Sequence, residues 1–261
     1  MLKTLTNIKL LCWFNFFNDF RPYNAVAVIY FAQVTGSYAL ALAVYSVSYI
    51  SSAVFELPTG VLSDLVGRKR TIVLGALCAT LSIILYAFGG SFGILAVGSI
   101  LDGLAQSFFS GNNEALLYDS LKENKKESFF SELLGKTSSM FQLGLGTSAF
   151  IGGFLADWSL SFVMWVSVIP QAFGLLVALY ITEPNVHSNK HSTNVFDHLS
   201  DALKRFKENY SLRMISLASI WSYTVGETIF KFVPAFYASL WPLWAIGLAR
   251  SLSHAASAAS Y

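Results

Sequence analysis

Long apolar runs alternate with short polar segments along almost the whole chain. The runs cover residues 10–33, 40–62, 71–89, 92–117, 138–155, 160–181 and 212–232, and an eighth begins near residue 243. A helix of about 20 apolar residues spans the hydrocarbon core of a bilayer. Backbone polar groups must be satisfied internally there, so each run is predicted to be a helix. We therefore expect an all-α fold, a polytopic membrane helix bundle.

The composition supports a membrane protein and excludes several other classes. Charged residues make up 12% of the 261 residues, whereas soluble domains contain about 25%. Cys12 and Cys78 both lie inside apolar runs and are interpreted as buried thiols. The sequence contains no phosphate-binding loop, nucleophile elbow, metal-ligand spacing or basic nucleic-acid face. We therefore expect no enzyme, no cofactor, no metal site and no nucleic-acid partner.

Basic residues orient the predicted helices. They lie before the first run and after the second, fourth and sixth runs: Lys3, Lys9, Arg68, Lys69, Arg70, Lys122, Lys125, Lys126, Lys190, Lys204, Arg205, Lys207 and Arg213. The alternate segments, around Gly36, Gly90 and Trp158, contain no Lys or Arg. Because positively charged loops stay on the cytoplasmic side, we expect a cytoplasmic N-terminus in an integral protein of the plasma membrane.

One long polar segment divides the chain into three predicted regions. Residues 182–210 separate six helices, in residues 1–181, from the helices of residues 211–261. Within this linker, Phe196, Leu199, Leu203 and Phe206 recur at helical spacing with basic residues between them. This pattern predicts an amphipathic helix on the inner membrane surface.

The segment between the second and third runs carries the most specific motif. It reads Gly-Val-Leu-Ser-Asp-Leu-Val-Gly-Arg-Lys-Arg from Gly60 to Arg70. Its two glycines suit a cramped turn, so we interpret the segment as a tight, charged hairpin on one aqueous face. The segment resembles the cytoplasmic loop between helices two and three of the major facilitator superfamily of secondary transporters. The superfamily motif is Gly-x-Leu-Ala-Asp-x-x-Gly-Arg-Lys/Arg, and Ser63 replaces its alanine.

The resemblance implies a fold and a gate. It implies a six-helix N-terminal half followed by an incomplete second half, the two being related by a pseudo-twofold axis. It also implies a cytoplasmic gate built from Gly60, Asp64, Gly67, Arg68, Lys69 and Asp119. In that gate Arg68 pairs with Asp119, and Asp64 contacts the second half. The implied function is transport of a small solute by alternating access, with protons as candidate coupling ions.

Two further superfamily motifs are incomplete. No arginine occurs in residues 99–105, where a helix-four arginine motif is expected. Residues 148–153 keep the final Gly152-Gly153 of a Gly-Pro-x-x-Gly-Gly motif typical of drug/proton antiporters, but lack its Gly-Pro pair. These departures weaken an assignment to the drug antiporters and leave the resemblance to the superfamily intact.

A few ionisable residues lie deep inside the predicted membrane helices, and the candidates are Asp19, Arg21, Asp102, Glu227 and Lys231. Such residues are costly in lipid and mark a polar cavity or a pairing partner. Asp19 and Arg21 are about 200° apart on a continuous helix, although Pro22 can unwind that turn.

Two interpretations of these charges stay open at this point. Asp19, Arg21 and Asp102 form a substrate or proton site, or Arg21 forms a static pair with one of the aspartates. A buried carboxylate can take up and release a proton as access alternates, so Asp19 and Asp102 are the candidates. Glu227 and Lys231, four residues apart, form a local ion pair or face the cavity.

The chain ends inside its eighth apolar run, so we expect a partial form of a twelve-helix transporter. Its expected partners are a small-molecule substrate, protons, the lipid bilayer and either a missing C-terminal half or a second copy. The alternative is a non-transporting membrane scaffold, or a half-transporter that acts as a dimer. A scaffold would assemble through two stripes of small residues at four-residue spacing: Ser99, Gly103, Ser107 and Gly111, and Gly144, Ser148, Gly152 and Ala156.

Overall fold

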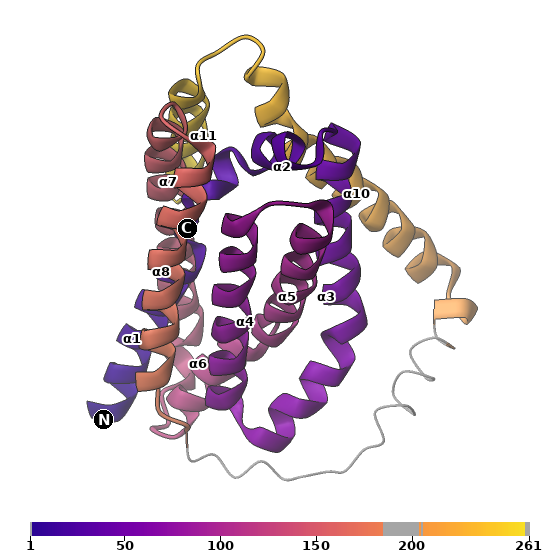
Figure 1. The fold of residues 1–261 in the computed structure, drawn as a ribbon. Helices are drawn as coiled ribbons and strands as arrows, with labels where there is room; N and C mark the ends of the chain where they lie inside the picture. Colours follow the sequence, from indigo (N-terminus) through magenta and orange to yellow (C-terminus); the bar gives the residue numbers. More distant parts are fainter. Residues whose placement is uncertain (1, 185–203, 205, 259–261) are drawn as a thin grey trace. The chain divides into compact units, whose positions relative to one another are not determined.

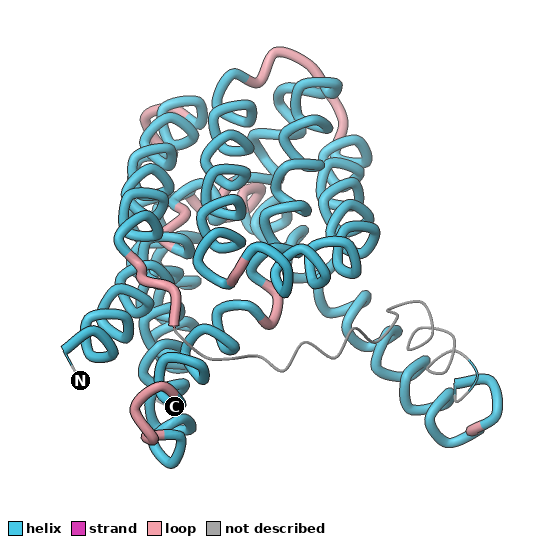
Figure 2. Tube along the Cα trace, turned by 90° about the horizontal axis from the view of Figure 1, so that it is seen from below, coloured by secondary structure: helices cyan, strands magenta, loops and turns pink. Residues whose placement is uncertain are grey.

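The computed structural model describes residues 2–184, 204 and 206–258, and Figure 2 shows helices and short loops throughout this part of the chain, with no strand. The chain divides into two compact units, Met1–Val186 with Pro234–Tyr261, and His187–Val233. The predicted amphipathic helix of the linker, with Phe196, Leu199 and Leu203, lies outside the described residues. The three predicted regions stay a prediction.

Most of the helices belong to the first unit. They are α1 (Leu2–Asp19), η1 (Pro22–Ala25), α2 (Ala27–Thr35), α3 (Tyr38–Val66), α4 (Arg68–Phe88), α5 (Phe92–Phe109), α6 (Asn112–Lys122), η2 (Glu127–Phe129), α7 (Phe130–Ala156), α8 (Leu160–Tyr180) and α11 (Leu243–Ala258). The second unit contains α10 (Tyr210–Tyr237) as far as Val233.

Helices of the first unit are neighbours in an order that differs from their order in the chain. α3 packs on α5, α5 on α4, α4 on α8, α8 on α1, α1 on α7, and α7 on α11 (Figure 1). α5 therefore lies against both α3 and α4, and α1 lies against both α7 and α8. Within this bundle Arg21, which follows the end of α1, reaches Asp102 in the middle of α5, 81 residues later in the chain.

The predicted all-α membrane bundle is confirmed. Among the described residues, five helical stretches are long and apolar enough to cross a membrane: Tyr38–Val66, Arg68–Phe88, Phe92–Lys122, Glu127–Ala156 and Leu160–Tyr180. The first apolar run was predicted to form one helix, but in the structure it is interrupted between α1 and α2. The cause of this interruption is Pro22, as described below.

The turn after α3 is shorter than the predicted hairpin. Gly60 lies inside α3, and Arg68 begins α4, so only Gly67 separates the two helices. Gly67 has φ +99°, a left-handed conformation that glycine adopts without steric cost. The expectation of a cramped backbone at both glycines is thus wrong for Gly60, around which a Cβ atom would meet nothing within 4 Å.

Serine residues begin three of the membrane helices. Ser37, Ser91 and Ser159 are the N-caps of α3, α5 and α8, and each side chain accepts a hydrogen bond from a backbone N–H of the first turn. Such caps satisfy donors that the helix itself leaves unpaired. All three lie in the segments that lack Lys and Arg, so a neutral hydroxyl begins each of these helices.

The stripes of small residues are packing surfaces. A Cβ atom on Gly103 of α5 would meet the backbone oxygen of Ser48 on α3, and one on Gly152 of α7 would meet the backbone oxygen of Pro22. On the other side of α7, Gly153 lies against Gly247 of α11, at 2.7 Å from a Cβ atom built on Gly153 to the Cα atom of Gly247. Small residues thus let neighbouring backbones approach closely within the bundle.

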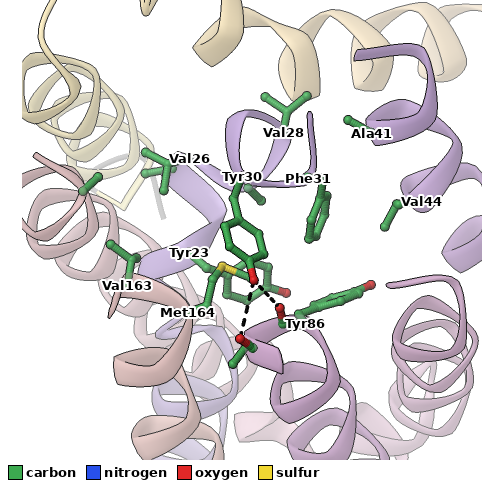
Figure 3. Packing of buried hydrophobic residues seen from close by; sticks show 14 of the residues in the cluster. Tyr23, Val26, Val28, Tyr30, Phe31, Ala41, Val44, Tyr86, Val163 and Met164 are labelled. Atoms are coloured by element: carbon green, nitrogen blue, oxygen red, sulfur yellow. Dashed lines mark hydrogen bonds between the residues drawn. The ribbon is translucent and has the colours of Figure 1, made fainter. Parts of the chain in front are cut away.

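Two apolar clusters lie at opposite ends of the first unit. One contains Phe31 and Tyr86 with residues of η1, α2, α3, α5 and α8, and Figure 3 shows the Tyr30 hydroxyl reaching the carbonyls of Tyr86 and Ala87. The other contains Leu11 and Phe14 of α1 with residues of α4, α6 and α8. Along the first apolar run, the interruption at residues 20–21 lies between the two clusters.

Candidate functional site

The interruption after α1 follows from one proline. Proline has no backbone N–H, and it pushes the preceding residue out of the helical region. Arg21 accordingly has φ −121° and ψ 81°, and Pro22 begins the short helix η1. The backbone N–H of Tyr23 is then free of the α1 ladder and donates to Ser167 Oγ of α8 at 3.1 Å. The broken turn is thereby satisfied by a neighbouring helix, as irregular backbone in a membrane requires.

Arg21 leaves this interruption and pairs with Asp102 of α5. Its Nη1 atom lies 3.3 Å from Asp102 Oδ1, and the two side chains are 12% and 13% exposed. The other carboxylate oxygen, Oδ2, accepts hydrogen bonds from Ser48 Oγ of α3 at 2.7 Å and from Gln106 Nε2 at 2.9 Å. Asp102 therefore joins three helical segments, and its charge is compensated by one cation and two neutral donors.

Arg21 and Gln171 both donate hydrogen bonds to the backbone carbonyl of Asn18. Arg21 Nε donates to the Asn18 carbonyl at 2.7 Å, and Gln171 Nε2 of α8 donates to the same carbonyl at 2.9 Å. This carbonyl belongs to the last turn of α1 and lacks a full set of helical partners. The partial negative charge of a helix C-terminus favours a cation there, so the end of α1 itself attracts the guanidinium.

Asp19 lies beside this pair. It is the last residue of α1, and its Oδ2 atom accepts a hydrogen bond from Asn18 Nδ2 at 3.3 Å. Arg21, Asp102 and Asp19 thus gather around the interruption in the first apolar run. The structure selects Asp102 as the aspartate that forms the ion pair with Arg21. Whether the three residues bind substrate or protons stays a prediction.

A second charged cluster lies where α3 meets α4. Arg68 Nη2 lies 3.1 Å from Asp64 Oδ1, one helical turn earlier in the chain, and Arg68 Nε lies 3.8 Å from Asp119 Oδ2 of α6. Arg68 Nη1 also donates to Ser63 Oγ at 2.9 Å. The contact expected between Arg68 and Asp119 is therefore present, alongside a shorter one to Asp64. The role of this cluster as a gate stays a prediction.

Glu183 connects the same cluster to the end of α8. Its two carboxylate oxygens accept hydrogen bonds from the backbone N–H groups of Arg68 at 2.8 Å and Lys69 at 2.7 Å. A Cβ atom on Gly67 would lie 2.9 Å from this carboxylate. Three basic residues in the first turn of α4 oppose the helix dipole, and the Glu183 carboxylate compensates both the dipole and their charge.

Several of these partners were not among the residues singled out from the sequence. Ser48 and Gln106 are neutral residues in apolar helices and carry no motif of their own, although Gln106 lies four residues after Asp102 on the same helix face. Glu183 lies just after the sixth apolar run, and its only signal was that it is an isolated acid beside Pro184. Arg250, within the eighth run, is a further cation at membrane depth in the sequence.

Arg250 and His254 connect α11 to η1 and α7. Arg250 Nη1 donates to the Asn24 carbonyl of η1 at 3.0 Å. His254 Nδ1 lies 3.0 Å from Gln142 Oε1 of α7. His254 was not among the residues singled out from the sequence, and the structure places it half-buried, on α11 beside α7. α11 is therefore attached to the bundle through polar contacts as well as through Gly247.

Glu227 and Lys231 belong to the second compact unit. Both lie on α10, and Lys231 Nζ lies 5.9 Å from the centre of the Phe230 ring. The site around Arg21 and Asp102 is built from the first unit alone. The predicted role of Glu227 and Lys231 stays a prediction.

Comparison with known proteins places these features in a family. The profile described as Major Facilitator Superfamily matches residues 10–260. An uncharacterized MFS-type transporter of Methanocaldococcus jannaschii is 28% identical over 128 residues, which are 49% of this chain and 32% of that protein. The class E tetracycline resistance protein of Escherichia coli is 24% identical over 215 residues, 82% of this chain and 49% of that protein.

A solved structure shows the same fold. The crystal structure of a D-xylose-proton symporter matches with a TM-score of 0.74 and 13% sequence identity, covering 98% of this chain and 66% of that chain. The matched segments span 32% and 49% of the lengths of the two curated relatives above. The family is one of transporters and not of enzymes.

Proposed function

Because this chain belongs to the Major Facilitator Superfamily and is an integral membrane protein, we propose that the whole protein is a secondary transporter that moves a small solute by alternating access. Alternating access needs two helix bundles that rock around a site near the bilayer midplane. The chain spans about half or less of the curated relatives reported above. Further helices, in a longer chain or in a second copy, therefore complete the transporter in this proposal.

The observation that carries the proposal is the Arg21–Asp102 pair. A charged pair inside an apolar bundle is expensive in lipid and is a functional candidate for that reason. It lies at an interrupted helix, and half-helix ends are where transporters of this general kind bind charged groups. Substrate of either charge can exchange with one member of the pair, since each has a counter-charge and neutral hydrogen-bond partners in place.

We assign the coupling and gating roles to two groups of residues. Asp19 and Asp102 are the proposed proton sites, since each is a carboxylate at membrane depth beside Arg21. Asp64, Arg68, Lys69, Asp119 and Glu183 are the proposed cytoplasmic gate, with Gly67 as its turn. Release of the Asp64–Arg68 contact would free Asp64 for the second half. Glu227 and Lys231 stay candidates for the cavity wall of that half.

The orientation belongs to the same proposal. The basic segments lie on one side of the predicted helices, which favours a cytoplasmic N-terminus and a protein of the plasma membrane. The Asp64–Arg68–Asp119 cluster then lies at the cytoplasmic end of the bundle, and the Ser-capped turns lie at the opposite end.

Cysteine accessibility separates this proposal from a membrane scaffold. In a full-length protein with Cys12 and Cys78 replaced by serine, a Ser48→Cys variant places a thiol beside Asp102, and a Ser99→Cys variant places one in the packed contact with Tyr86. A water-accessible cavity predicts that a membrane-impermeant thiol reagent labels position 48 at least about tenfold faster than position 99. Equal, slow labelling from both sides of the membrane would indicate a scaffold with fixed pairs.

A further inference from the structure

A groove lies at the basic end of the first unit, away from the Arg21–Asp102 site. Its volume is about 520 Å³, and it lies between the first half of α1, the segment after α6 and the first half of α7. Its lining is almost entirely apolar and includes Trp13 of α1 and Met140 of α7. Its rim contains the ammonium-bearing residues Lys9, Lys126 and Lys136. None of these residues takes part in the proposed transport site.

On each of two helices, a lysine of the groove is followed one turn later by an apolar lining residue. Lys9 and Trp13 are four residues apart on α1, and Lys136 and Met140 are four residues apart on α7. Four residues are one turn, about 6 Å along the axis. Both helices run away from the basic end of the bundle, so on each a lysine lies one turn nearer to the membrane surface than an apolar side chain.

The cationic rim is only partly compensated. Lys136 pairs with Glu132 at 2.7 Å, an exposed contact whose two side chains are 60% and 58% exposed. Among the described residues, Lys9 and Lys126 form no ion pair. Lys126 lies next to the short helix η2, where Phe129 is half exposed. Two uncompensated cations above an apolar floor attract an amphiphile with an anionic end.

The exposed side chains show that the groove lies on the outside of the unit. Trp13 is 56% exposed, and its ring stacks on Phe17, which stacks in turn on Phe173 of α8, itself half exposed. Tryptophan and tyrosine are enriched at the membrane–water interfaces, where one end of the side chain is apolar and the other is wet. A soluble anion would gain nothing from this aromatic and thioether floor.

From this geometry we propose that the groove binds an anionic phospholipid of the cytoplasmic leaflet. The phosphate lies between Lys9 and Lys126, and an acyl chain lies along Trp13 and Met140. Anionic lipids are concentrated in that leaflet, and basic pockets between membrane helices are suited to their headgroups. The bound lipid would hold the beginning of α1 to α7 and leave the Arg21–Asp102 site unoccupied, so the proposal is independent of the transported solute.

Fluorescence quenching by brominated lipids tests this proposal. The full-length protein is placed in nanodiscs that contain phosphatidylglycerol or phosphatidylcholine with brominated acyl chains at equal mole fraction. The contribution of Trp13 is the difference in quenching between the unmodified protein and a Trp13→Phe variant, so that the other tryptophans of the protein cancel in the comparison. We expect phosphatidylglycerol to quench Trp13 more strongly than phosphatidylcholine does.

Two double variants then separate a specific site from general surface charge. Lys9→Gln/Lys126→Gln removes the two uncompensated rim cations, and Lys122→Gln/Lys125→Gln removes the same charge from exposed positions of the neighbouring segment that do not line the groove. Because Lys9 and Lys126 line the groove, the first variant should lose at least about tenfold in preference for phosphatidylglycerol, which corresponds to about 1.4 kcal/mol. The second should keep that preference.

Three results would overturn the proposal. Equal quenching by both lipids would show a groove filled by any lipid chain. Equal loss in the two double variants would show nonspecific attraction to the surface. Absence of Trp13 quenching by either lipid would show that other helices of the whole protein cover the groove. Retention of bound phosphatidylglycerol in native mass spectra of the same variants provides a second readout that does not depend on Trp13.

Discussion

The guanidinium of Arg21 lies 3.3 Å from the carboxylate of Asp102, although 81 positions separate the two residues in the chain. The contact exists because α1 ends at Asp19, two residues before Arg21, and Pro22 prevents the helix from continuing. The released arginine then points to α5 instead of continuing along its own helix. A sequence-local event, the break at one proline, thus frees Arg21 for a contact with a distant helix.

The first prediction concerns the two members of this pair. Arg21→Gln or Asp102→Asn leaves an uncompensated buried charge, which costs about 3 kcal/mol or more. The double variant leaves two neutral groups and should be more stable than either single variant. The measurement is the unfolding temperature of the detergent-purified protein, followed by its monodispersity on heating. A double variant with the summed loss of both singles would contradict a direct pair.

A second prediction concerns Arg68 and Asp119. Arg68→Asp and Asp119→Arg each replace the opposite charges of this 3.8 Å contact with like charges, so each should reduce transport or the surface yield of the full-length protein. The combined charge swap should recover part of that loss, because opposite charges face each other again. Recovery should be incomplete, since the shorter contact of Arg68 to Asp64 is not restored. Purely additive losses would argue against the pairing.

The third prediction concerns Glu183. Replacing it with alanine leaves the backbone N–H groups of Arg68 and Lys69 without their acceptors. Loss of a helix cap costs about 1 kcal/mol, so the unfolding temperature should fall. A Glu183→Gln variant keeps an acceptor but loses the charge near the helix start. If Gln restores full stability, hydrogen bonding and not charge is what α4 requires; if Gln equals Ala, the charge is essential.

A fourth prediction compares two helical glycines, one with no space for a Cβ atom and one with ample space. A Gly103→Ala Cβ atom would lie 2.7 Å from the Cβ atom of Ser51, and closer still to a backbone oxygen of α3. Overpacking of this kind costs about 1–3 kcal/mol, so the yield of folded protein should fall. Gly135→Ala on α7 meets nothing within 4 Å and should be neutral or stabilising, because alanine favours a helix over glycine. Similar losses in both variants would contradict the close approach of α3 and α5.

Much of the architecture was predictable because it depends on local properties. The length of each apolar run, the basic residues between the runs, and the motif from Gly60 to Arg70 are all written into contiguous sequence. Hydrocarbon requires every backbone group to be paired inside its own segment, so a run of about 20 apolar residues leaves almost no choice but a helix. The family assignment follows from the same local pattern.

What the sequence by itself determined is therefore the helical class, the number and order of the apolar segments and the positions of the costly charges. Only the tertiary structure decided which charges meet. Asp102 rather than Asp19 forms the ion pair with Arg21, Glu183 rather than a residue of the motif satisfies the start of α4, and Gly67 rather than Gly60 makes the turn. The first two outcomes depend on which helices become neighbours, whereas the third depends on where α3 ends. Small residues such as Gly103 and Gly152 allow neighbouring backbones to approach closely, but no periodicity along a single helix encodes which helices become neighbours.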